Sequence, residues 1–413
     1  MEQSKLAAGW RATRSLAGLG LCWLLGAQLA LAQATGPQDK ASRTADKAGA
    51  SSKSASPALN LDALPLAQRP GALAQALGRP RRLLVGVGTT DTGTVLGQNL
   101  SPDIYDQYLN GVGTDSWLSW NSPSGAYVDI VIQHAEMVGA VPMFTLYQMA
   151  ARGDSNLSGL TDPTFMTPYW NQVRLLFQKL GRYGRPVLVN LEPDFWGYTQ
   201  RAQADPHRMP ALVHPNPDCA GLADTVAGVA ACLIRTARTH APRTLVGFPP
   251  SMFDDLKATD VAYMQRLGAG QADFVVMQTQ DRDAGCMEAQ NRAAACVRNG
   301  RHWYWDDSNA NPSNSQTFHQ HFAEARRYFE GLQKPLLWWQ TPLGVPAAKP
   351  SSSPPWRDNR VRYFLTHPQE LVAAGGVGVV FSPGERSQTT LRTDGGQFKT
   401  LSKAYFAQPA PLP

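Results

Sequence analysis

Short apolar runs alternate with longer amphipathic stretches between residues 83 and 381, and each pattern predicts one kind of element. Runs of about five apolar residues fit parallel strands that are buried on both faces. Apolar residues at three- and four-residue spacings fit helices. We expect eight strands, at 83–87, 105–109, 141–147, 187–191, 244–248, 273–277, 336–339 and 377–381. We expect helices at 126–138, 169–180, 223–240, 261–267, 318–332 and 361–374.

This alternation predicts an α/β fold, and in particular a single-domain (β/α)8 TIM barrel. Eight strands are the number that closes such a barrel, and the length of the stretch falls within its range. A doubly wound open sheet is the competing fold. That fold would carry a G-x-G-x-x-G turn after the first strand, but Gly86, Gly88 and Gly93 have a different spacing. The barrel is therefore the preferred fold.

The beginning of the chain has the pattern of a secretory signal peptide. Lys5, Arg11 and Arg14 form a positive segment, residues 16–31 are almost entirely apolar, and Ala30 and Ala32 give the small-x-small pattern of a cleavage site. We therefore expect a signal peptide at 1–32 and a secreted or periplasmic protein. The apolar run is short for a membrane span and a polar tail follows it, so we expect no stable membrane insertion.

A low-complexity spacer is expected at 33–80, with the barrel at 81–413. Up to about residue 57 the spacer has scarcely a large apolar side chain, so burial cannot offset the entropy cost of ordering it. The leucines within 59–77 allow that part to lie against the barrel surface. We therefore expect the folded body to begin at residue 81.

Export makes the cysteines informative. Cys22 lies inside the signal peptide, which leaves Cys219, Cys232, Cys286 and Cys296 in an oxidising compartment. Three pairings are possible. We expect Cys219–Cys232 and Cys286–Cys296, because each bond would close a short local loop. A metal site is less well supported, because the chain has no C-x-x-C motif.

Charge excludes one class of partner. The net charge of +6 is spread along the chain, and the densest basic tract, residues 79–82, is short. Nucleic-acid binding needs a basic face with interleaved aromatic residues, so we expect no nucleic-acid partner. We expect a monomer that uses no cofactor and no metal.

The predicted strand exits hold carboxylates, amides and aromatic rings, and in a TIM barrel the chemistry lies at these exits. They carry no Ser–His, Cys or Lys nucleophile motif and no phosphate-binding glycine loop. This set of side chains fits sugar chemistry, in which one acid protonates a glycosidic oxygen while a second carboxylate or water attacks the anomeric carbon. The candidate catalytic residues are Glu192, Asp194, Asp281 and Asp283. The candidate substrate-binding residues are Asp91, Tyr147, Gln148, Trp196, Tyr198, Gln278, Trp339 and Gln340.

Glu192 follows directly on an apolar strand in the stretch PVLVNLEPDFWGY. At a barrel mouth with apolar surroundings its pKa would be raised, which suits a general acid. Asp194 lies two residues further on and would share a face with Glu192 in an extended segment. The alternative is that Glu192 caps the next helix or pairs with an arginine.

The stretch VLVNLEPDFWGY resembles the strand-four acid segment of TIM-barrel glycoside hydrolases, and LLWWQTPLG lies where those enzymes carry strand-seven residues. The resemblance covers residues 81–406 in architecture but only these short pieces in sequence, and it names no family within the superfamily. It implies a glycosidase. One position departs from the pattern, because Gln340 stands where the large retaining group has a second glutamate, and an amide cannot form the covalent intermediate.

Three arrangements remain open after this departure. Asp281 or Asp283 could activate water in an inverting mechanism. Asp194 could orient a substrate N-acetyl group that itself attacks, with Glu192 as the only acid. In the third, the barrel binds sugar without cleaving it.

The leading functional prediction is a secreted glycoside hydrolase that acts on a polysaccharide. The first alternative is a non-catalytic carbohydrate-binding barrel, which Gln340 favours. The second is a polysaccharide lyase, in which a basic residue such as Arg282 or Arg301 would neutralise a uronate.

Overall fold

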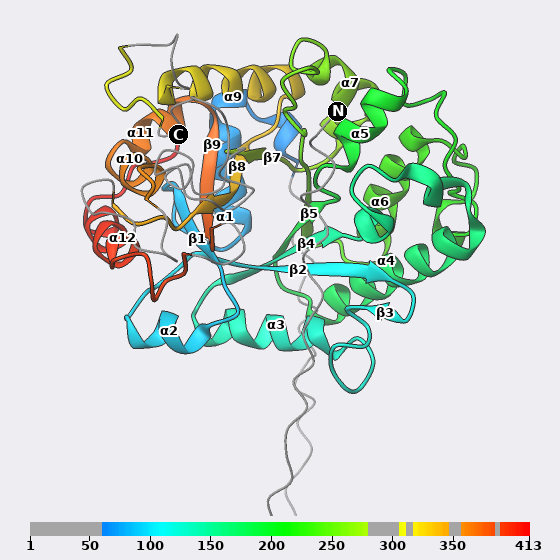
Figure 1. Ribbon diagram of the computed structural model, residues 1–413, viewed down its shortest axis with the longest axis horizontal. Coiled ribbons are helices and arrows are strands. Elements are labelled where there is room, and N and C mark those ends of the chain that lie inside the picture. Colours follow the sequence, from blue (N-terminus) through cyan, green and yellow to red (C-terminus); the bar gives the residue numbers. More distant parts are fainter. Residues whose placement is uncertain (1–59, 280–304, 311–316, 347–356, 385–388) are drawn as a thin grey trace, which may run out of the picture. The chain divides into compact units, whose positions relative to one another are not determined.

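Eight parallel strands close into a barrel, and helices surround it (Figure 1). The computed structural model describes residues 60–279, 305–310, 317–346, 357–384 and 389–413. Neighbouring strands around the barrel are β1, β2, β4, β5, β6, β7, β8 and β9, and β9 pairs with β1 again. The short β3 runs antiparallel to the end of β2. The predicted (β/α)8 barrel is confirmed.

All eight predicted strands overlap a barrel strand. The strands are β1 (Leu84–Gly88), β2 (Ile104–Val112), β3 (Asp115–Ser116), β4 (Val141–Tyr147), β5 (Val187–Leu191), β6 (Thr244–Phe248), β7 (Phe274–Gln278), β8 (Leu336–Pro342) and β9 (Gly376–Ser382). The α-helices in the described part of the chain are α1 (Arg69–Ala76), α2 (Thr92–Gly97), α3 (Ala126–Met137), α4 (Pro163–Tyr183), α5 (Phe195–Ala202), α6 (Val226–His240), α7 (Asp260–Leu267), α9 (Phe318–Leu332), α10 (Arg360–Thr366), α11 (Pro368–Ala373) and α12 (Gln397–Ala407).

Local sequence sets where the helices begin and end. The Asp162 carboxylate caps α4 by accepting a hydrogen bond from the Thr164 N–H at 2.8 Å, and Gly184 ends this helix with a φ of 66°. The stretch 361–374, predicted as one helix, forms two. The break falls at Pro368, which has no N–H to continue the ladder of α10 and instead starts α11.

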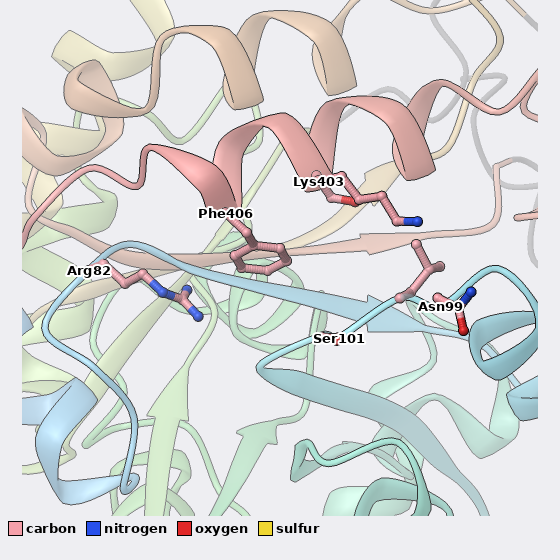
Figure 2. A pocket seen from close by; sticks show the side chains of 7 residues that line it. Arg82, Asn99, Ser101, Lys403 and Phe406 are labelled. Atoms are coloured by element: carbon pink, nitrogen blue, oxygen red, sulfur yellow. The ribbon is translucent and has the colours of Figure 1, made fainter.

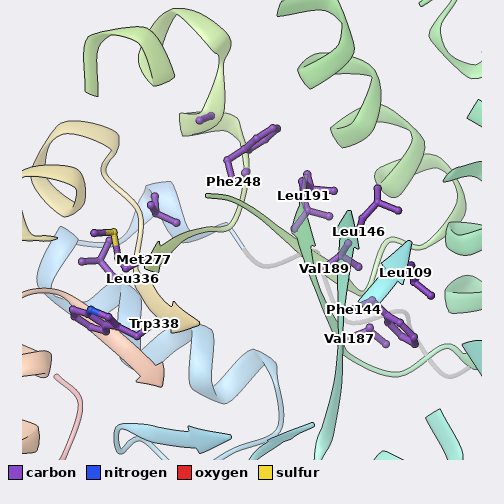
Figure 3. Close-up of a cluster of buried hydrophobic side chains, with 14 of the residues drawn as sticks. Leu109, Phe144, Leu146, Val187, Val189, Leu191, Phe248, Met277, Leu336 and Trp338 are labelled. Atoms are coloured by element: carbon purple, nitrogen blue, oxygen red, sulfur yellow. The ribbon is translucent and has the colours of Figure 1, made fainter. Parts of the chain in front are cut away.

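Side chains of the strands alternate between two cores. On β5, Val187, Val189 and Leu191 face the surrounding helices, whereas Leu188 belongs to the core inside the barrel. Figure 3 shows outward-facing side chains of this kind from β4, β5 and β8. The adjacent Trp338 and Trp339 separate in the same way, Trp338 into the outer core and Trp339 into the inner core, as the period of a strand requires.

The segment before β1 closes the end of the barrel at which the strands begin. Leu61, Leu73 and Leu77 lie in the inner core, and Leu412 from the end of the chain joins them. The Leu412 N–H donates to the Arg81 carbonyl at 3.0 Å. Residues 60–80 therefore belong to the folded body, and the boundary predicted at residue 81 is wrong, because the leucines of this segment fill the open end of the barrel.

A disulfide joins Cys219 to Cys232, which confirms one of the two predicted bonds. Both half-cystines are buried, and Cys232 lies on α6. Cys286 and Cys296 lie outside the described residues, so their pairing stays a prediction, as do the signal peptide and the spacer up to residue 59. Within the described ranges, no helix combines the length and the apolar character needed to cross a membrane.

Candidate active site

The barrel interior becomes polar toward the ends of the strands. Asp106 accepts hydrogen bonds from Thr145 Oγ1 and from Trp339 Nε1, both at 3.0 Å. The Asn190 amide donates to Thr145 Oγ1 at 3.5 Å. All four side chains are buried, and burial raises the pKa of Asp106 to about 7 although these hydrogen bonds act in the opposite direction. These four residues form a polar floor beneath the barrel mouth.

Tyr108 and Gln340 connect this floor to the mouth. The Tyr108 ring centroid lies 5.6 Å from that of Trp339 and 6.2 Å from that of Tyr147. Gln340 Nε2 donates to the Tyr108 hydroxyl. Trp339, predicted as a sugar platform, is only 3% exposed, whereas Tyr108 is partly exposed. Tyr108 is therefore the ring that the mouth presents in this part of the barrel.

Two carboxylates meet at the Tyr147 hydroxyl. This hydroxyl donates to Asp154 Oδ1 at 2.6 Å and lies 3.4 Å from Asp194 Oδ2. Gln278 Nε2 donates to Asp194 Oδ1 at 3.4 Å. Burial and then the charges of Asp194 and Asp154 raise the pKa of Tyr147, so its hydroxyl stays a proton donor. The mouth thus joins three residues selected from the sequence, Tyr147, Asp194 and Gln278, with Asp154, which was not selected.

The rim beside this pair carries two further rings. Tyr198 on α5 lies 5.2 Å from Phe253 between ring centroids, and burial followed by the charges of Asp194 and Asp154 raises its pKa. Ser251 Oγ accepts from the Gly197 N–H at 2.8 Å and donates to the Asp194 carbonyl at 3.1 Å. The loop after β6 is therefore tied to the segment that carries Asp194.

Left-handed backbone conformations gather at the mouth. Glu192, Asp194 and Met252, which follow strands β5 and β6, have φ values of 55°, 64° and 51°. Gln340, which lies within β8 where its pairing with β9 is irregular, has a φ of 56°. Such conformations are unfavourable for residues with side chains and often mark functional sites, where the surrounding structure maintains them. This concentration supports the mouth as the candidate site.

The Glu192 side chain does not reach the barrel mouth, where a general acid would meet the substrate. The side chain is fully buried, and its Oε2 accepts hydrogen bonds from the backbone N–H groups of Gln148 at 2.8 Å and Met149 at 2.9 Å. Burial raises the pKa of Glu192 to about 8. The buried Tyr169 of α4 is close enough to affect this pKa. The left-handed backbone at Glu192 and Asp194 breaks the extended conformation that their predicted shared face requires.

Three other predicted residues have structural contacts. Asp91 caps α2 and accepts from Arg392 Nε at 2.6 Å, and hydrogen bonds from Arg392 and Thr94 lower its pKa to about 2. The buried Gln148 donates to the Gly111 carbonyl at 2.5 Å. Trp196 is fully buried, so it packs in the core and is not a sugar platform here.

Two predicted site residues lie outside the described part of the chain, and two residues of the site were not among the predicted candidates. Asp281 and Asp283 lie beyond the described residues, so their catalytic role stays a prediction. Asp106 carries a sequence signal that was passed over, namely a charge in the middle of a buried strand. Asp154 carries no comparable signal, because its position depends on the turn after β4, in which Gly153 has a φ of 110°.

A cavity lies away from this site, at the end of the barrel where β1 and β2 begin (Figure 2). It has a volume of about 370 Å³ and is lined by Arg82, Ser101, Lys403 and Phe406 among others. Arg82 is already paired with Asp103 at 2.7 and 2.9 Å. This cavity shares no residue with the mouth, and chemistry in a TIM barrel belongs to the other end.

The comparisons with known proteins give remote structural likeness alone. No protein-family model matches the chain, and no curated protein matches it. An endo-1,4-beta-D-mannanase from Thermotoga petrophila RKU-1 superposes with a TM-score of 0.43 at 11% identity, over 79% of this chain and 99% of its own. The virulence factor SghA gives 0.43 at 13% identity, over 81% and 98%. A D-allulose 3-epimerase from Methylomonas sp. gives 0.40 at 10%, over 80% and 98%.

These proteins include a mannanase and a sugar epimerase, and likeness at this level carries no information about the activity of the chain. The fold itself follows from the strand pairing described above. The activity has to be argued from the side chains at the mouth.

Proposed function

We propose that this chain is an exported glycoside hydrolase that cleaves a polysaccharide at the mouth of its barrel. The observation that supports this proposal best is the pair of carboxylates, Asp154 and Asp194, that approach one hydroxyl, Tyr147. Hydrolysis of a glycosidic bond needs two such groups, one to donate a proton and one to attack or to activate water. The amides of Gln278 and Gln340 beside them are suited to sugar hydroxyls.

The spacing of the two carboxylates bears on the mechanism. Because Asp154 Oδ1 and Asp194 Oδ2 lie 2.6 and 3.4 Å from the same oxygen, they stand at most about 6 Å apart, which is below the roughly 6.5–9.5 Å of inverting glycosidases and favours a retaining mechanism. We assign attack on the anomeric carbon to Asp194, which a donor from β7 also orients. We assign proton donation to the glycosidic oxygen to Asp154.

A second candidate function is a barrel that binds saccharides without cleaving them. Gln340 supports it, because an amide lies in the last part of β8 and its hydrogen bond to Tyr108 serves binding as well as catalysis. In that case Asp154 and Asp194 would only accept hydrogen bonds from sugar hydroxyls.

The test is the release of reducing ends from a panel of bacterial and plant polysaccharides. Asp194→Asn and Asp154→Asn should each lower the rate on a cleaved polymer by roughly 10² to 10⁴-fold. Asp255→Asn is the matched control, because this aspartate lies in the loop after β6, pairs with Arg201 and has a side chain that is 56% exposed. It should keep the wild-type rate. Binding without release by the wild type would instead support the second candidate.

A further inference from the structure

The loop that leaves β4 is fixed from below by one buried side chain. Glu192 Oε2 accepts two hydrogen bonds, from the backbone N–H groups of Gln148 and Met149, at 2.8 and 2.9 Å. The Gln148 amide adds a second attachment, to the Gly111 carbonyl at the end of β2. The first residues of this loop are therefore held to both neighbouring strands of the barrel.

The same loop carries one of the two carboxylates of the proposed site. Residues Met149–Arg152 form a single 3-10 turn, Gly153 follows with a φ of 110°, and Asp154 then accepts the hydrogen bond from Tyr147. Asp154 has no strand of its own to position it. A displacement of the turn at Gln148 and Met149 would therefore move Asp154 relative to Tyr147.

We propose that Glu192 is a positioning residue, which holds the loop after β4 and thereby places Asp154 against Tyr147, and that it does not touch the substrate. The expected effect on catalysis rests on the proposed function. The contact between Glu192 and the loop after β4 is independent of that function. Both oxygens of Glu192 are enclosed: Oε2 takes the two N–H groups, and Oε1 is buried. The side chain is fully buried, so a sugar ring at the mouth cannot reach it without opening the loop.

The chemistry of the contact separates this role from acid catalysis. Two backbone N–H groups need an acceptor oxygen, and the carboxamide oxygen of glutamine supplies one at the same position without a titrating proton. The Tyr169 hydroxyl interacts with the Glu192 carboxylate, and a glutamine amide could donate to this hydroxyl instead. Glu192→Gln should therefore preserve the loop, whereas Glu192→Ala removes the acceptor and leaves two buried donors unpaired, which is costly.

The experiment measures amide hydrogen exchange at Gln148 and Met149 together with the rate of polysaccharide cleavage. In Glu192→Ala the two amides should exchange at least about tenfold faster than in the wild type, because the loop opens locally. In Glu192→Gln, exchange and rate should stay within about threefold of wild type and the pH profile should not move, whereas loss of a general acid costs roughly 10² to 10⁴-fold.

Asp273→Ala is the matched control. Asp273 is also buried and also accepts a backbone N–H, from Val246 at 2.8 Å, but it lies at the beginning of β7, at the far end of the barrel. Its loss should leave exchange at Gln148 and Met149 unchanged. If Glu192→Ala does not fold, Glu192→Asp serves instead, because its shorter side chain withdraws the acceptor from the loop and should also speed exchange.

Two results would overturn the inference. One is unchanged exchange at both amides in the alanine or aspartate variant. The other is a Glu192→Gln enzyme that loses the rate expected for a missing acid while its loop exchanges as in the wild type. A wild-type protein that cleaves no polysaccharide would refute the proposed function. Because amide exchange needs no substrate, the exchange data would still show whether Glu192 holds the loop.

Discussion

Asp106 is a carboxyl group whose ionisation should be visible in the stability of the protein. Its pKa is about 7 in the folded state, because it is buried, against about 3.9 in the unfolded chain. Between these values the folded state binds a proton that the unfolded state does not, so the free energy of unfolding falls as the pH rises from about 4 to 7. The loss is on the order of a few kcal/mol, and it is complete above pH 7.

Asp106→Asn should remove this loss, since the amide stays neutral. We expect the free energy of unfolding of the variant, relative to wild type, to increase between pH 4 and pH 8, as measured by urea denaturation at both values. Only the difference is informative, because burial lowers the pKa of His321 to about 3 and gives both proteins an opposite slope up to about pH 6.5. A difference that does not change with pH would mean that Asp106 is ionised in the folded protein at both values.

The residue scale is also where sequence reasoning was least complete. The stretch around Glu192 and Asp194 could be located, because a carboxylate directly after an apolar run is conspicuous. The direction in which each of these side chains points could not be predicted, because it depends on left-handed φ values at both residues. Asp154 could not be selected because its position depends on the turn after β4, which a buried contact from another strand maintains.

At the scale of elements, the strands were predictable because each is an apolar run covered on both faces, and that pattern has few alternatives. The ends of the helices were less predictable than the strands. The break before Pro368 follows from a missing N–H, yet the apolar spacing continues through it and gives no sign of two helices. The closure of the sheet into a barrel was predictable from the number of strands, and no single strand indicated it.

The Cys219–Cys232 bond makes an element-scale prediction, because it ties the connection between α5 and α6 to α6 itself. Its two half-cystines are 13 residues apart. A loop of this length in the chain-entropy account corresponds to about 3 kcal/mol. The double variant Cys219→Ala/Cys232→Ala should lose about 2–4 kcal/mol in urea denaturation and keep its rate at temperatures where it is folded.

The reference for this variant is the wild-type protein unfolded with and without a reductant. Reduction should lower the stability of the wild type by more than that of the variant, because only the wild type has the Cys219–Cys232 bond to lose. Equal stability of the variant and the oxidised wild type would show that the bond adds nothing to this part of the fold.

Across the whole molecule, the two ends of the barrel have different compositions. Where the strands begin, the interior holds leucines from α1, the strands and the end of the chain. Where they end, it holds Asp106, Asn190 and the residues of the mouth. Burial of polar groups is costly and burial of apolar groups is favourable, so stability is concentrated at the first end and chemistry can be concentrated at the second.

The last prediction tests this division with two leucines. Leu73 on α1 is fully buried in the inner core, whereas Leu96 on α2 is 44% exposed. Leu73→Ala should cost about 2–5 kcal/mol of unfolding free energy, and Leu96→Ala within about 0.5 kcal/mol, because only the first leaves a cavity. Both changes place alanine in a short helix, so helix propensity cancels in the comparison. Measured by urea denaturation, equal costs would mean that residues 60–80 only lie on the surface and that the folded body starts at residue 81 after all. Because Leu73 is far from the mouth, the folded Leu73→Ala protein should still cleave at the wild-type rate.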